Sequence, residues 1–171
     1  MDDTQNASTG VNAVTPEKTR TRRFIGSYNH SLDSKGRLVI PQVFREKLGE
    51  TFCIAPSLDF TSVAIYPTEK WEERAAEYEK RDSLDPEVEE YKEMFYALSY
   101  EEQTCDAQGR VLLPSNIRMK LLDEERDMEI TGANDHVRIA GVSASNEKWN
   151  KFRKDLPEML RSIASKGRQS D

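Results

Sequence analysis

Apolar residues along the chain follow two different spacings. Short β-prone runs at 38–40, 51–55, 62–66, 111–113, 127–131 and 136–140 are bounded by turn-forming residues, which is typical of strands joined by turns. Longer segments between and after these runs carry apolar residues at helical spacing. The pattern predicts an α+β fold.

Two helices are predicted between the strand-rich parts. Trp71, Ala75 and Tyr78 mark the apolar stripe of the first. Asp85 and Pro86 look like the N-cap and first-turn proline of the second. Its apolar residues then recur at i, i+3, i+7 and i+10, namely Val88, Tyr91, Phe95 and Leu98.

A last helix is predicted from about Asn146. We expect it to bury Trp149, Phe152 and Leu156 on one side. Pro157 lacks an amide hydrogen and should kink or restart this helix before its last apolar residues, which are Met159, Leu160 and Ile163.

The chain contains an internal repeat. Asp33-Ser-Lys-Gly-Arg37-Leu-Val-Ile-Pro41 recurs 73 residues later as Asp106-Ala-Gln-Gly-Arg110-Val-Leu-Leu-Pro114, and the match continues to Leu48 and Leu121 with seven identities in sixteen positions. After a small shift, 52–71 resembles 128–149, and both end in Glu-Lys-Trp. The duplicated unit is strand-rich and is followed by a helix.

Each unit places a polar turn before a strand and a short helix. Gly36 and Gly109 suit the positive-φ position of a hairpin-like turn. Pro41 and Pro114 end the strands and fit the first position of a helix. The helices should bury an i, i+4 pair, Phe44 and Leu48 in one unit and Ile117 and Leu121 in the other.

We therefore expect six parts: a disordered extension at 1–22, unit one at 24–70, linking helices at 71–100, unit two at 101–145, a C-terminal helix at 146–165 and a disordered tail at 166–171. Both tails are polar and lack apolar periodicity.

Length and composition narrow the class of protein. The 171 residues are 36% hydrophobic and 33% charged, and no apolar run approaches the roughly 18 residues of a membrane span. The first residues lack the basic region followed by an apolar region that is typical of a secretory signal, so we predict a cytoplasmic protein. Cys53 and Cys105 lack CxxC spacing and lie in contexts typical of buried thiols.

The net charge of −6 argues at first against a nucleic-acid partner. However, 69–102 alone holds 13 acidic side chains against 5 basic ones, whereas 17–48 is basic. A basic face is therefore possible on an acidic protein. Arg20, Arg22 and Arg23 form either a solvated arm or an arm that contacts phosphates.

Catalytic chemistry has little support, and we predict no enzyme, metal or cofactor. His30 and His136 have no partner at metal-binding spacing, and no phosphate-binding glycine motif occurs. Asp33 and Asp106 could be imagined as an acid/base pair. Instead, each precedes an arginine by four residues across a glycine turn, where an aspartate can accept backbone N–H bonds and hold the arginine.

Arg37 and Arg110 allow two interpretations. Each can simply stiffen its turn by pairing with the aspartate. Alternatively, each can present a fixed fork of donors to phosphate oxygens or to the O6/N7 edge of guanine. Two such turns per chain, multiplied by oligomerisation, would let weak contacts add along repeated DNA sites.

Three stretches closely resemble the MraZ family of bacterial transcriptional regulators: 24–26, 33–41 and 105–114. The resemblance covers about 24–160, with the repeat spacing, the acidic helices and the Trp-bearing last helix. It implies two SpoVT-AbrB-like units, of swapped-hairpin or double-psi-like type, that form a small β-barrel core with flanking helices. It also implies a ring-shaped homo-oligomer, commonly an octamer.

The same resemblance implies a sequence-specific, nucleoid-associated regulator that binds short direct repeats in double-stranded DNA of its own promoter region. It usually represses the division and cell-wall gene cluster. In the family the two turns face DNA, which assigns DNA contacts to Arg37, Arg110 and Lys35, and orienting or turn-forming roles to Asp33, Asp106, Gly36 and Gly109. Ala107 and Gln108 replace Ser34 and Lys35, so unequal halves are expected.

A second class of function stays open. Units of this kind also occur in antitoxins, where a disordered tail neutralises a partner protein, and this chain has polar tails at both ends. The alternative is an antitoxin-like or other protein-interaction module with only non-specific DNA affinity. The complete second unit favours the regulator, and the acidic helices could also bind a partner.

Overall fold

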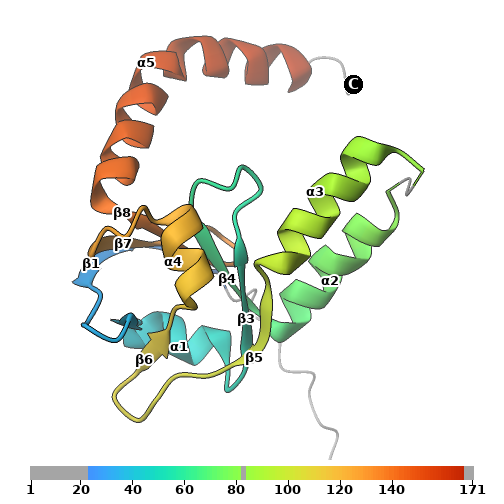
Figure 1. The fold of residues 1–171 in the computed structure, drawn as a ribbon. Coiled ribbons are helices and arrows are strands. Elements are labelled where there is room, and N and C mark those ends of the chain that lie inside the picture. The colour runs from blue at the N-terminus through green and yellow to red at the C-terminus, as the bar shows by residue number, and fades with distance from the viewer. Residues whose placement is uncertain (1–22, 82–83, 168–171) are drawn as a thin grey trace, which may run out of the picture.

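The computed structural model describes residues 23–81 and 84–167. The expected extension at 1–22, with Arg20 and Arg22, lies outside the described residues, as do residues 168–171. Within the described part, five helices surround antiparallel strands, which confirms the α+β class (Figure 1). No described helix is both long enough and apolar enough to cross a membrane.

One order of elements occurs twice. The first series is β1 (Ser27–Ser31), β2 (Arg37–Val39), α1 (Gln42–Leu48), β3 (Phe52–Pro56), β4 (Val63–Pro67) and α2 (Thr68–Glu79). After α3 (Pro86–Ala97), the second is β5 (Tyr100–Gln103), β6 (Arg110–Leu112), α4 (Ser115–Leu121), β7 (Asp127–Gly132), β8 (Val137–Gly141) and α5 (Val142–Gly167). The bounds of β2 and β6, and those of α1 and α4, differ by the 73 residues of the sequence repeat.

The strands form two sheets. Six of them pair in the order β1-β7-β8-β4-β3-β5, and β2 pairs with β6 in a separate two-stranded sheet. The β3–β4 and β7–β8 pairs lie within one residue of the predicted strands.

Both predicted hairpin-like turns form, since the Gly36 N–H donates to the Asp33 C=O and the Gly109 N–H donates to the Asp106 C=O. The strands next to the turns pair across the two halves of the chain, β1 with β7 and β2 with β6. Leu38 lies opposite Val111, and both are buried in the shared core. Each turn therefore leads from one sheet into the other, and the two halves of the chain interlock.

The apolar core between the halves orders the short helices. All four predicted stripe residues of α1 and α4 are buried: Phe44, Leu48, Ile117 and Leu121. Pro41 and Pro114 occupy the N-cap, one position before the predicted one. The core holds β2, β6, α1 and α4 together, and so fixes the place of the turns that precede β2 and β6.

The helices α2 and α3 form a hairpin beside the sheet (Figure 1). Trp71, Tyr78 and Phe95 make a second buried cluster there. Asp85 caps α3 as predicted, because its side chain accepts a hydrogen bond from the Glu87 N–H.

The helix α5 departs from the prediction in its bounds. It begins at Val142 and not at about Asn146, and it includes residues 166 and 167, which were expected in the tail. It continues through Pro157 without a restart, and Figure 1 shows α5 bent, in agreement with the alternative of a kink. Trp149 is 51% exposed and Phe152 is 37% exposed, so their predicted burial is wrong. Figure 1 shows why: α5 rises away from the sheet from its first turns and bends only further along.

Candidate nucleic-acid interface

The first polar turn is built by one aspartate. The Asp33 C=O accepts a hydrogen bond from the Gly36 N–H at 3.0 Å, and its N–H donates to the Arg37 C=O at 2.9 Å. Its carboxylate Oδ1 accepts the N–H groups of Lys35 and Arg37, both at 2.9 Å. Oδ2 accepts the Arg37 Nε–H at 2.7 Å, which fixes the direction of the guanidinium.

The second turn repeats this network. Asp106 binds the Gly109 N–H and the Arg110 C=O at 2.9 and 2.8 Å. Its Oδ1 accepts the N–H groups of Gln108 and Arg110 at 3.0 and 2.9 Å, and its Oδ2 accepts the Arg110 Nε–H at 2.8 Å. The glycines have φ of 79° for Gly36 and 74° for Gly109, as the sequence predicts.

The N–H donors keep both carboxylates ionised. The backbone N–H of Arg37 is the largest cause that lowers the pKa of Asp33 to about 2, with smaller contributions from the Arg37 guanidinium and the Lys35 N–H. The pKa of Asp106 is lowered in the same way, first by the backbone N–H of Arg110. Each turn therefore holds a permanent Asp–Arg pair at neutral pH.

The interlocked strands bring the two turns together at one end of the molecule (Figure 1). The Ile40 N–H donates to the Gly109 C=O at 2.9 Å, and the Leu113 N–H donates to the Gly36 C=O at 3.0 Å. Arg110 Nη1 lies 3.8 Å from Asp33 Oδ2, an ion pair between the turns. Residues 73 apart in sequence thus form one surface.

Two further arginines, Arg45 and Arg118, support the turns crosswise. A Cβ added to Gly36 would lie 2.6 Å from Arg118 Cζ, and one added to Gly109 would lie 2.5 Å from Arg45 Cζ. Arg45 Nε–H donates to the Ile40 C=O at 3.0 Å, and Arg118 Nε–H donates to the Leu113 C=O at 3.1 Å. The helix arginine of each unit packs against the glycine turn of the other unit.

Sequence reasoning missed this role. Arg45 and Arg118 are an identical pair of the repeat, 73 residues apart, but identity alone does not show what their side chains contact. Their contacts depend on the crossed strand pairing, which the repeat does not show. With them, the turns 33–37 and 106–110 and the two short helices carry seven basic side chains, at 35, 37, 45, 47, 110, 118 and 120, against three acidic ones, at 33, 46 and 106.

The two turns differ in how free the guanidinium is. Arg110 Nη2 donates to Gln108 Oε1 at 2.7 Å. In the described part of the chain, no residue accepts a hydrogen bond from Nη1 or Nη2 of Arg37. Lys35, which stands where Gln108 stands in the second turn, is exposed. The first turn therefore presents more unpaired positive donors than the second.

The remaining candidates lie elsewhere. Arg23 is exposed, and its C=O accepts a hydrogen bond from Lys47 Nζ at 2.7 Å, which places it beside α1. His136 stacks on Tyr66 and contacts Asp135. Residues 23–81 and 84–167 contain no group of three or more His, Cys, Asp or Glu side chains arranged to hold a metal.

The cysteines differ in burial. Cys53 is buried as predicted, and this burial raises the pKa of its thiol to about 12. Cys105 is only partly buried.

Comparison with known proteins gives a consistent result. Residues 23–93 match the model of a family described as "MraZ protein, putative antitoxin-like". The chain is 36% identical over 143 residues to the transcriptional regulator MraZ of Acetivibrio thermocellus, covering 84% of this chain and 95% of that protein. It is 35% identical over 129 residues to the protein of the same name from Clostridium tetani, covering 75% and 86%. It is also 34% identical over 129 residues to the protein of the same name from Lactiplantibacillus plantarum, covering 75% of this chain and 86% of that protein.

Proposed function

Because the chain belongs to the MraZ family, we propose that it is a DNA-binding transcriptional regulator whose two Asp-x-x-Gly-Arg turns contact DNA. The observation that carries the proposal is the pair of identically hydrogen-bonded turns at one end of the molecule, each aiming one arginine. Arg37, held by its Nε, keeps both Nη groups for a bidentate contact, which is the geometry that reads guanine in the major groove. Arg110 is held in the same way, but its Nη2 is bonded to Gln108.

The rigid spacing of the turns supports this role. Strands β2 and β6 and the crossed arginines fix the two guanidinium groups relative to each other before DNA binds. A preformed surface loses little conformational freedom on binding, so more of the contact energy contributes to affinity. The B-DNA major groove is about 12 Å wide and admits a two-stranded ribbon.

The finer proposal concerns assembly and target. The chain would form two SpoVT-AbrB-like units, within 24–70 and 101–145, and assemble as a ring-shaped homo-oligomer, commonly an octamer. The ring would place turn pairs on successive short direct repeats in its own promoter region and repress the division and cell-wall gene cluster. Repeated contacts explain how a chain of net charge −6 can bind DNA, because effective concentration strengthens each later contact. The protein would then be cytoplasmic and associated with the nucleoid.

The test is fluorescence anisotropy on duplex DNA from upstream of the protein's own operon, against a shuffled duplex, over a salt series. Arg37→Ala should weaken specific binding by about 1–3 kcal/mol, or roughly 5- to 150-fold, with the fold intact. Arg161→Ala, which removes an exposed arginine of α5, is the matched control and should bind as the parent does.

Two outcomes would contradict the proposal. One is an unchanged binding curve for a folded Arg37→Ala protein. The other is that the parent binds both duplexes equally and that physiological salt abolishes this binding. The latter would favour the antitoxin-like alternative, for which a stoichiometric partner protein should co-purify.

A further inference from the structure

Helix α5 carries an apolar stripe that the rest of the described chain leaves uncovered. Trp149, Phe152, Leu156, Met159 and Ile163 repeat at i, i+3, i+7, i+10 and i+14, the spacing of a helix face that packs against another element. Among α5 residues 142–166, only Ser145, near the start of the helix, is buried. Met159 and Ile163 are 41% and 60% exposed.

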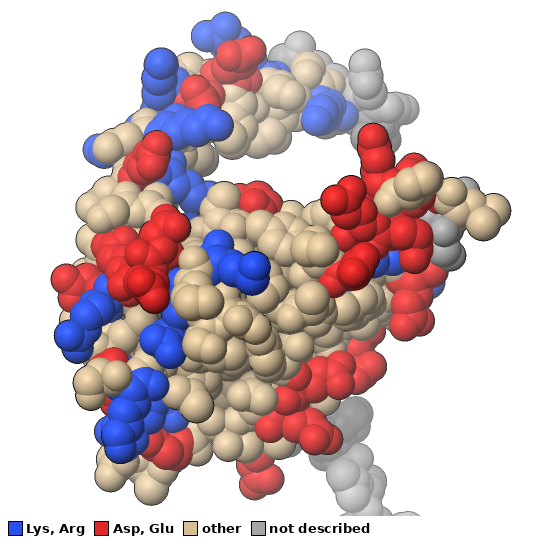
Figure 2. Space-filling view, viewed as in Figure 1, with Lys and Arg blue, Asp and Glu red and all other residues tan. Residues whose placement is uncertain are grey.

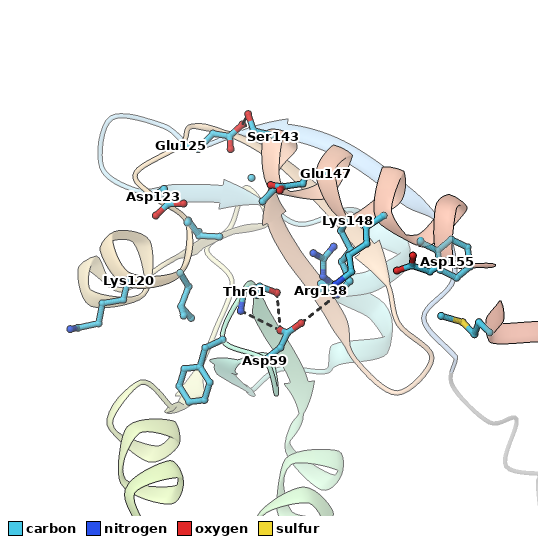
Figure 3. A pocket seen from close by; sticks show the side chains of 18 residues that line it. Asp59, Thr61, Lys120, Asp123, Glu125, Arg138, Ser143, Glu147, Lys148 and Asp155 are labelled. Carbon is cyan, nitrogen blue, oxygen red and sulfur yellow. Dashed lines mark hydrogen bonds and ion pairs between the residues drawn. The ribbon is translucent and has the colours of Figure 1, made fainter. Parts of the chain in front are cut away.

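The stripe borders a hollow and not a core. Phe152 and Met159 line a cavity of about 1100 Å³ between α5, the end of α4 and the β3–β4 loop (Figure 3). The labelled side chains in this cavity carry both signs of charge, and Lys148 lies 3.7 Å from Asp59. The same hollow separates α5 from the body in Figure 2.

The internal repeat shows what covers such a stripe. Glu-Lys-Trp ends at Trp71 in the first half and at Trp149 in the second. Trp71 is 2% exposed because α3 lies on it, with Phe95 stacked on its ring at 5.8 Å. Trp149 is 51% exposed because no helix follows α5 within the described chain. An acidic amphipathic helix covers the tryptophan in one half, and the equivalent cover is missing in the other.

Charge indicates the missing partner. Helix α5 has six basic residues against three acidic ones, whereas 68–97, which spans α2 and α3, has eleven acidic residues against five basic ones. Figure 2 shows acidic side chains gathered over the α2–α3 hairpin and basic ones along α5. Helix α3 of the hairpin also exposes the apolar ring of Tyr96, at 38%. Tyr96 lines a shallow groove together with Glu90 and Glu93.

We propose that α5 of one copy docks its apolar stripe and basic flanks on the acidic α2–α3 hairpin of a second copy. The two surfaces belong to different parts of the chain, so the contact is heterologous, and a heterologous contact that closes on itself produces a ring. This inference rests on the self-association proposed above and assigns the surfaces that make it.

Reversal of four charges tests the pairing. Lys151 and Arg153 are exposed on either side of Phe152, and Glu90 and Glu93 are exposed on α3. Lys151→Glu with Arg153→Glu places acid against acid, and Glu90→Lys with Glu93→Lys places base against base. Each double variant should raise the dissociation constant of the assembly by more than about tenfold, read as a loss of mass in light scattering.

The matched control changes the same charge on the opposite face of α5. Lys154 lies about 200° further round the helix axis than Phe152, so Lys154→Glu with Arg161→Glu should leave the mass unchanged. Far-UV circular dichroism checks that all variants keep the parent's secondary structure.

Mixing gives the decisive result. In an equimolar mixture of the two double variants, each α5 meets a hairpin of opposite charge on its neighbour, so the mixture should regain the parent's mass. A different result would place the contact within one chain and overturn the inference: the mixture keeps the reduced mass, whereas the variant that carries all four substitutions in the same chain regains the parent's mass. Unchanged masses for both double variants of an oligomeric parent overturn it too, and leave the proposed DNA binding untouched. A monomeric parent would instead contradict the proposed ring itself.

Discussion

At the scale of single residues, one position separates the two turns. Gln108 ties up an Nη group of Arg110, whereas Lys35 at the equivalent position leaves Arg37 free and adds an exposed positive charge. Lys35 is a point charge without a planar fork, so it suits a phosphate better than a base edge. The first turn should therefore contribute more of the salt-dependent affinity than the second.

We predict that Lys35→Ala weakens binding to specific and shuffled duplexes alike. It should lower the slope of log affinity against log salt by about 1, because one fewer counterion is released. Gln108→Ala is the control at the equivalent position and should leave the slope as it is. Anisotropy titrations at four or more salt concentrations measure both slopes. Equal slopes for parent and Lys35→Ala would remove Lys35 from the interface.

The aspartates give a prediction about acid. The pKa of Asp33 is lowered to about 2 in the folded protein, against about 3.9 in an unfolded chain. Its stabilisation is thus fully present above that unfolded value and is lost as pH falls toward 2. The difference in unfolding free energy between parent and Asp33→Asn should be constant above about pH 5 and shrink below pH 4. Urea unfolding at a series of pH values measures this, and a difference that stays constant down to pH 2.5 would contradict it.

At the scale of elements, the short helices α1 and α4 support the turns crosswise. Arg118, on α4, lies against Gly36, and Arg45, on α1, lies against Gly109. The contact is specific in its direction: the unit that holds a turn does not supply the arginine that supports it.

We predict a crossed effect of two substitutions. Arg118→Ala should speed amide hydrogen exchange about fivefold in the turn at 33–37 and leave 106–110 near the parent rate, because it removes support worth about 1 kcal/mol. Arg45→Ala should do the reverse. Hydrogen exchange followed by mass spectrometry on the two peptides measures both. Faster exchange in both turns for either variant would mean general destabilisation in place of crossed support.

The sequence predicted elements well where the signal is local. Asp85 caps α3, the glycine turns have positive φ, and the stripe of Phe44 and Leu48 is buried, since each follows from residues within a few positions. Strand partners could not be predicted in this way. Leu38 and Val111 are each compatible with a hairpin in their own unit, and only the shared core selects the crossed pairing.

The error at α5 has a related cause. Periodicity shows that Trp149 and Phe152 lie on the same face of the helix, but it does not show that another element of the chain packs against this face. In the first half, α3 covers Trp71, whereas the second half of the described chain has no counterpart of α3, so Trp149 stays exposed.

At the scale of the whole molecule, the halves share one core. Strand β1 pairs with β7, β3 with β5, and β2 with β6, so each half supplies strands to the other. The turns therefore keep their relative position only while both halves are folded, which couples the proposed DNA-binding surface to global stability.

This interlocking predicts how fragments behave. Fragments 1–98 and 99–171, made separately, should each lack a cooperative thermal transition as monomers, because β1 and β2 lose their partners in one and β5, β6 and β7 lose theirs in the other. Mixed in equal amounts, they should recover the transition and the far-UV circular dichroism of the full chain as a one-to-one complex. Circular dichroism with light scattering measures both. A fragment that melts cooperatively as a monomer would show that one half can build its own core, and that the crossed strands join two independently stable units.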